Sequence, residues 1–136
     1  MSAALELQAE LYSTLINAPD ITALVPADNI GEGRALNGIP AIRIGSIIEV
    51  PAGLTFERRH SRMAVDIAIF AREPGTATVR YLADLIRQAV EEISIADPAY
   101  HLVDIRWDGT RVMRDGADPE LAHAIVGFTA LVETYA

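Results

Sequence analysis

The chain of 136 residues has a length typical of a single domain with one hydrophobic core, and we predict one domain over residues 1–136. It carries a net charge of −8, and all eleven basic residues are arginine. The acidic balance disfavours a protein that grips nucleic acid through its phosphates, because that affinity comes from clustered basic side chains. The sequence contains no cysteine, which excludes disulfides, thiolate nucleophiles and cysteine metal sites.

No apolar run approaches the roughly 18 residues that a membrane-spanning helix needs. The amino terminus, MSAALELQAE, has acids where a signal peptide would begin with basic residues. We therefore expect no membrane partner, and we expect the protein to be made and kept in a cytoplasm.

Residues 3–17 have apolar side chains at helical spacing and predict a helix whose stripe is Ala4, Leu7, Leu11 and Leu15. Residues 18–26 predict a short helical turn with Asp20 as its N-cap, packed back on that helix. Residues 27–40, with three glycines and a proline, predict an irregular connector that contains a short strand near 29–30.

Two stretches, 41–50 and 62–72, alternate apolar and polar residues and predict half-buried strands. Their apolar members share one parity: Ile42, Ile44, Ile48 and Val50 in the first, and Met63, Val65, Ile67, Ile69 and Ala71 in the second. A hairpin is the simplest connection between the two strands, although its loop is longer than a tight turn requires.

The period then changes to that of a helix over residues 76–93, with Thr76 or Thr78 as the expected N-cap. Residues 101–108 alternate again and predict a strand, followed by an Asp-Gly turn or bulge. In this strand we expect Val103, Ile105 and Trp107 to face away from Leu102, Asp104 and Arg106. Residues 121–135 predict the last strand, with apolar side chains on both faces.

This element order predicts an α+β fold: a mostly antiparallel sheet of four to five strands with two long helices packed on one face. The second sheet face would carry more apolar side chains than a monomer leaves in water, namely Ile47, Phe70, Leu102, Ile125 and Leu131. We therefore expect another subunit to cover this face.

A basic cluster precedes the second strand, formed by Arg58, Arg59, His60 and Arg62. It could bind an anion, but no glycine-rich loop opens a helix beside it, so the backbone amides that usually hold phosphate are missing. A hairpin tip that contacts a subunit is favoured, because arginine is enriched in protein interfaces.

Other signatures of chemistry are weak. The histidines, His60, His101 and His123, never stand at the i, i+3 or i, i+4 spacing of a helical metal pair. The stretch DGADPE lacks the glycine and glutamate of a calcium loop, and no serine lies in a G-x-S-x-G motif. We predict no catalytic, cofactor or metal site, while a small anion-binding enzyme subunit that uses the basic cluster remains an alternative.

Three phrases, IPAIRIGS (39–46), RRHSRMAVDIAIFAREPG (58–75) and TRVMRDGADPELAHAIVGFTALVE (110–133), resemble the small tail-completion family of tailed bacteriophages in order and spacing. The likeness covers nearly the whole chain. The chain departs from the family pattern at Ala41, where an aromatic residue commonly follows the proline, and at Phe70, where a Trp or Tyr usually precedes the equivalent of residues 71–73.

The resemblance implies a non-enzymatic tail terminator of a phage, prophage or gene transfer agent. Such a protein forms a six-membered ring on the head-proximal end of the tail tube, at the head–tail junction of the virion, after assembly in the bacterial cytoplasm. The implied partners are further copies of the chain, the tail-tube protein and the head connector or stopper. Double-stranded DNA would pass through the ring without specific binding. A head-closure or stopper protein of the same apparatus is the alternative within this class.

Overall fold

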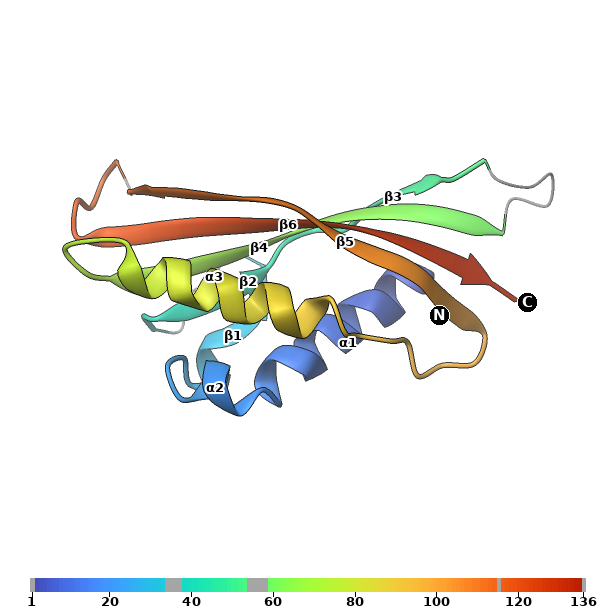
Figure 1. Ribbon diagram of the computed structural model, residues 1–136, viewed down its shortest axis with the longest axis horizontal. Coiled ribbons are helices and arrows are strands. Elements are labelled where there is room, and N and C mark those ends of the chain that lie inside the picture. Colours follow the sequence, from blue (N-terminus) through green and yellow to red (C-terminus); the bar gives the residue numbers. More distant parts are fainter. Residues whose placement is uncertain (1, 34–37, 54–58, 115, 136) are drawn as a thin grey trace.

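A six-stranded sheet with helices on one face forms the body of the protein (Figure 1). The computed structural model describes residues 2–33, 38–53, 59–114 and 116–135. The elements in chain order are α1 (Ala3–Ile16), α2 (Pro19–Thr22), a 3₁₀ turn (Ala27–Asn29), β1 (Ile30–Glu32), β2 (Ala41–Ile44), β3 (Ile48–Pro51), β4 (His60–Arg72), α3 (Ala77–Val90), β5 (Tyr100–Arg114) and β6 (Leu121–Thr134).

The strands are ordered β1-β2-β4-β6-β5, and β3 pairs with β4 beyond the end of β2. Every pairing is antiparallel except that of β1 with β2. The predicted architecture is therefore only roughly matched: α1 and α3 are the two long helices, but the sheet has six strands and includes one parallel pair. In Figure 1 the helices lie below the sheet, and the strands extend past them at the end where β3 lies.

The core lies between this helical layer and one face of the sheet. Helix α1 begins at its N-cap Ser2, whose hydroxyl accepts a hydrogen bond from the Leu5 amide at 3.1 Å. Its stripe is buried against the sheet, as are the apolar sides of α3 and β4, which contribute Leu7, Leu11, Leu15, Val79, Leu82, Ile86, Val65, Ile67 and Ile69. Both long helices and the face of β4 are thus confirmed.

The prediction of a single strand over residues 41–50 is wrong, because this stretch forms two separate strands, β2 and β3. At the break the Gly45 amide donates to the Asp66 carbonyl at 2.8 Å, and a β-carbon on Gly45 would lie 2.9 Å from that oxygen. All of β2 is buried, whereas all of β3 is exposed, so Ile48 and Val50 do not join the core as predicted.

The predicted faces of the 101–108 strand are also partly wrong. The ladder between β5 and β6 shifts register between Leu102 and Asp104, and again between Trp107 and Gly109. The first bulge lets Leu102 pack against the core together with Ile105, and leaves Val103 exposed. The second bulge confirms the predicted Asp-Gly irregularity.

Two helix starts differ in detail from the prediction. Helix α2 begins with Pro19 after the N-cap Ala18, so Asp20 lies in its first turn and is not the cap. Thr76 is the N-cap residue of α3, but its side chain makes no capping bond there. In the part of the chain that the structure describes, no helix has the length and apolar character to span a membrane.

Candidate assembly surface

The fold leaves the sheet face opposite the helices without a helical cover, and we call it the open face. The register of β4 with β6 pairs Phe70 with His123 and Arg62 with Leu131 on this face. The rings of Phe70 and His123 stack at a centroid distance of 4.3 Å and an interplanar angle of 14°. Phe70, Ile125 and Leu131 are each half-buried, so part of their apolar surface remains in contact with solvent.

Two of the five apolar residues predicted for the open face do not belong to it. Ile47 and Leu102 pack against the core, Leu102 because of the bulge that follows it. The prediction of an apolar surplus is therefore reduced to Phe70, Ile125 and Leu131.

One end of the open face is hollowed. A depression of about 720 Å³ has Phe70, Ala68 and Ile125 among its apolar lining and Asp66 and Arg43 among its polar lining. Apolar walls with a few polar groups are typical of binding sites.

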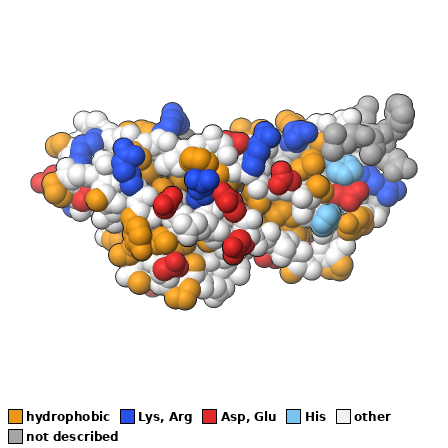
Figure 2. Space-filling model, in the orientation of Figure 1, with side chains coloured by type: hydrophobic (Ala, Val, Ile, Leu, Met, Phe, Trp, Pro, Cys, Tyr) orange, Lys and Arg blue, Asp and Glu red, His pale blue; other side chains and the backbone are white. Residues whose placement is uncertain are grey.

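The predicted basic cluster is described only in part. Arg58 lies outside the described residues, and Arg59 is exposed just before β4. The first residue of β4, His60, places its Nε2 3.4 Å from a Glu133 carboxylate oxygen, and Figure 2 shows histidine and acidic side chains together at this end of the molecule. Arg62 is exposed on the open face.

The predicted contact residues thus fall into two groups at opposite ends of one face. His60, Arg62 and Leu131 lie at the end of the sheet where β3 pairs with β4, whereas Phe70 and Ile125 line the hollow. Eight residues of β4 separate Arg62 from Phe70, which is about 26 Å at about 3.3 Å per strand residue. A single small partner group cannot touch both.

The helical side also has apolar side chains at its surface. In Figure 2 hydrophobic side chains gather over the region of α2 and α3. Tyr81 in α3 and Leu24, which follows α2, are both exposed. Arginines on the same view lie mainly along the strand layer.

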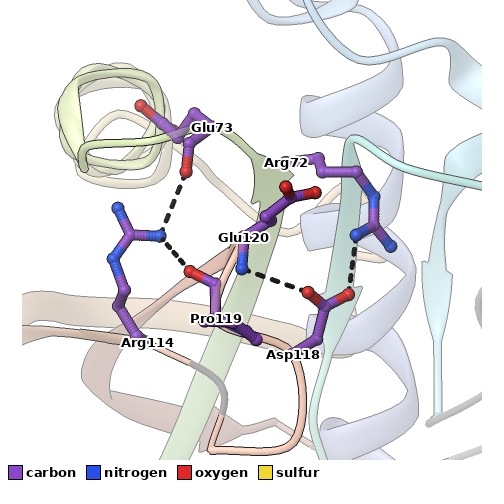
Figure 3. Close-up of polar contacts among 6 residues, drawn as sticks. All are labelled: Arg72, Glu73, Arg114, Asp118, Pro119 and Glu120. Carbon is purple, nitrogen blue, oxygen red and sulfur yellow. Dashed lines mark hydrogen bonds and ion pairs between the residues drawn. The ribbon is translucent and has the colours of Figure 1, made fainter.

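A polar cluster that the sequence analysis missed joins the β5–β6 turn to the start of α3 (Figure 3). The Arg114 guanidinium donates to four backbone carbonyls: those of Glu73 and Pro119, both at 3.0 Å, that of Gly75 at 2.6 Å, and that of Pro74. Glu73 in turn accepts from the Thr78 and Val79 amides at 2.9 and 3.2 Å, and so caps α3 in place of a threonine.

In the same cluster Arg72 donates to Asp118 at 2.6 Å. The hydrogen bond from Arg72, followed by that from the Glu120 amide, lowers the pKa of the Asp118 carboxyl below its ordinary value of 3.8. The same pair raises the pKa of the Arg72 guanidinium. This end of the molecule is therefore held by charge-assisted contacts between residues far apart in the sequence, and the only sequence signal for it was the turn in DGADPE.

Arg43 is the second residue whose environment the sequence did not reveal. It lies in β2, is only 7% exposed, and its Nη1 donates one long bond of 3.4 Å to the Glu32 carbonyl. Its Nε is buried without an acceptor. The alternation over residues 41–50 predicts a half-buried strand with Arg43 on its polar side, but both sides of β2 are covered.

Within the described ranges, no three histidine, aspartate or glutamate side chains come close enough together to hold a metal ion.

The family model of tail completion protein gp17 matches residues 9–133. The chain belongs to this family. In fold, the tail completion protein is similar to a chain of a solved structure described as the virion of a native gene transfer agent particle, with a TM-score of 0.78 and 17% identity over 98% of this chain and 99% of that one. A second solved chain has a TM-score of 0.63 and 11% identity over 99% of both chains. No curated protein matches the sequence.

Family membership confirms the resemblance seen in the three phrases and makes the protein a structural component of a phage-type tail. A tail component works by associating with other parts of the particle. The open face and the exposed β3 end are therefore the surfaces to consider for that association.

Proposed function

We propose that this tail completion protein is a tail terminator. Copies of the chain form a closed ring, six-membered as the family resemblance implies, on the head-proximal end of the tail tube. The ring stops tube polymerisation and offers a joining surface to the head connector. The protein has no catalytic role in this proposal.

The observation that carries the proposal is the open face. Phe70 and Ile125 line a hollow at one end of it, and Leu131 lies at the other end, level with β3 and separated from it by β4. A closed ring needs two different surfaces on each subunit, one for each neighbour. The outer strands β1 and β5 give the sheet two different edges for these neighbours, and the open face between them is available to a neighbouring subunit or another tail protein.

The net charge of the chain fits the passage of DNA through the ring. A charge of −8 per copy gives an acidic assembly, which repels the phosphate backbone. DNA in the channel would slide without being held. The exposed basic residue Arg62 near the β3 end is then available for protein contacts.

Electron microscopy of particles made without this protein tests the proposal. Overlong tail tubes are expected, since nothing would stop polymerisation. Tails of normal length on heads that leak DNA would instead identify a head-closure or stopper protein, and normal particles would refute both assembly roles. Complementation with the unaltered gene is the control.

A further inference from the structure

Arg43, in the second strand from one edge of the sheet, is buried without adequate partners. A guanidinium has five N–H donors, yet the described structure gives this one a single long bond and leaves Nε without an acceptor. No carboxylate in the described ranges forms an ion pair with it. A buried charge is stable only when it is paired and hydrogen-bonded, so the environment of Arg43 is incomplete in the isolated chain.

Gly31 makes room for this guanidinium. Residue 31 pairs with residue 43 across β1 and β2, and a β-carbon there would lie 2.6 Å from Nη1 of Arg43. A strand glycine of this kind marks a close approach to the backbone. The side chain therefore crosses the last strand of the sheet, and its head lies at the β1 edge.

The edge has a groove that fits a partner. The groove is about 530 Å³ and is lined by Arg43 together with Leu5, Ala9, Tyr12 and Ile30. Leu5 and Tyr12 are 48% and 41% exposed, although both are large apolar side chains. Two acids, Asp28 and Glu32, also border the groove. The Glu32 carboxylate accepts from the Gln8 amide, and neither acid forms an ion pair with Arg43 in the described structure. The groove thus offers apolar contact around a guanidinium with which neither acid pairs.

The complementary group is on the opposite edge of the same sheet, which is β5. Asp104 is exposed there and makes no ion pair with the described residues. Its neighbour Val103, displaced by the bulge, is 45% exposed. Asp108, the other acid of this edge, already bonds Thr129 and Arg106. The bulges also make β5 a poor template for adding a strand, so side chains dominate any contact at this edge.

We propose that Arg43 of one copy binds Asp104 of the next copy, with Val103 packed in the groove beside Leu5 and Tyr12. The inference rests on the proposed ring and names its subunit contact. Opposite sheet edges then meet head to tail, as a closed ring requires. An arginine and a carboxylate removed from water together form strong paired hydrogen bonds.

The pairing sets the stagger between neighbours. Arg43 is level with Ile125, whereas Asp104 is level with Leu131, six residues further along β6. Neighbouring copies are therefore shifted by about 20 Å along the strands. An unshifted neighbour would bring Arg43 toward Arg111, a like charge. In a β-barrel, closure with tilted strands requires a shift in register between neighbouring strands. A closed ring of tilted sheets requires the same kind of shift between neighbouring copies.

Cysteine cross-linking tests the contact directly, because the natural chain has no cysteine and hence no background. Chains with Leu5→Cys are mixed with chains with Val103→Cys, so that a disulfide between the two substituted positions can form only between copies. A cross-linked heterodimer is expected under mild oxidation. Mixing Leu5→Cys with Tyr81→Cys is the control, since Tyr81 is exposed on α3 and lies on neither edge.

Charge reversal gives the second measurement. Asp104→Arg, at an exposed position that folding tolerates, is expected to weaken ring association at least tenfold in sedimentation. Asp84→Arg makes the same charge change on the exposed side of α3 and is expected to leave association unchanged. Arg43→Gln should reproduce the loss, with circular dichroism and the melting temperature showing whether the fold is kept.

The outcomes separate this inference from the proposed function. A ring that forms with normal strength in Asp104→Arg, or without the Leu5–Val103 cross-link, overturns the pairing and leaves the ring intact. Cross-linking of Leu5→Cys to the tail-tube protein in place of a second copy also overturns it. If the unaltered chain forms no ring, alone or with tail tubes, the proposed function and the pairing both fail.

Discussion

Replacing Arg114 by methionine tests the energetic importance of the cluster in Figure 3. The substitution keeps a long side chain but removes every donor to the four carbonyls that the guanidinium joins. A hydrogen bond from a charged donor contributes about 1.5–3 kcal/mol when buried. Because Arg114 is half-exposed and water can replace it, we expect a total loss of about 2 kcal/mol in the free energy of unfolding.

Thermal and urea unfolding measure this loss. For 136 residues an unfolding entropy near 2.1 cal/mol/K per residue converts about 2 kcal/mol into a decrease of about 7 °C in Tm. Arg111→Met is the matched control, because Arg111 is exposed on the same strand and has no polar contact with the described residues. A loss in Arg114→Met no larger than that of the control, or below about 0.5 kcal/mol, would refute the anchoring role.

Three further predictions follow from single contacts. Glu73→Ala removes the cap of α3 and should cost about 1 kcal/mol of unfolding free energy in urea titration; an unchanged midpoint would contradict it. The depressed pKa of Asp118 means that its stabilising effect is complete above pH 3.8 and is lost as the pH falls through the lower folded-state pKa. Carbon-13 NMR titration should show this pKa rising toward 3.8 in Arg72→Gln, and no rise would exclude Arg72 as its cause. Leu131→Asp should reduce assembly while leaving the monomer folded, as judged by sedimentation and circular dichroism; full assembly would remove Leu131 from the contact.

The long elements could be predicted because their patterns are strict and local. In β4 the period-two run from Met63 to Ala71 has one apolar side throughout, the other side is polar or small except at Phe70, and the helix packs on the fully apolar side. Helix α3 has the same clarity at period 3.6. Local pattern and tertiary packing agree in these elements, so periodicity alone is enough to place their buried faces.

The remaining features depend on contacts that periodicity does not encode. Ile48 and Ile42 have the same parity in the alternating pattern. Ile48 nevertheless lies beyond the edge of the helical layer and is 66% exposed. The bulge after Leu102 changes which side of the sheet Leu102 and Val103 point toward. The amino-acid composition of the strand gives no sign of this change. The four acceptors of Arg114 include carbonyls about 40 positions away in the chain, and no local signal announces such a contact.

The candidate surface could be predicted only in part for the same reason. The apolar character of Phe70, Ile125 and Leu131 was visible in the sequence, and all three lie outside the core contacts. The burial of Arg43 was not visible, because it depends on which strands flank β2 and on the space that Gly31 leaves. The family resemblance predicted the role in a tail. The structure then identified the surfaces through which that role could be carried out.

A reconstruction of the head–tail junction of the native particle by electron cryomicroscopy tests the central claim most directly. We predict a closed ring of this chain at the head-proximal end of the tube, with Phe70 and Leu131 of each copy covered by a neighbouring subunit or another tail protein. A junction that lacks the chain, or a ring in which the open face remains in contact with water, would contradict the account.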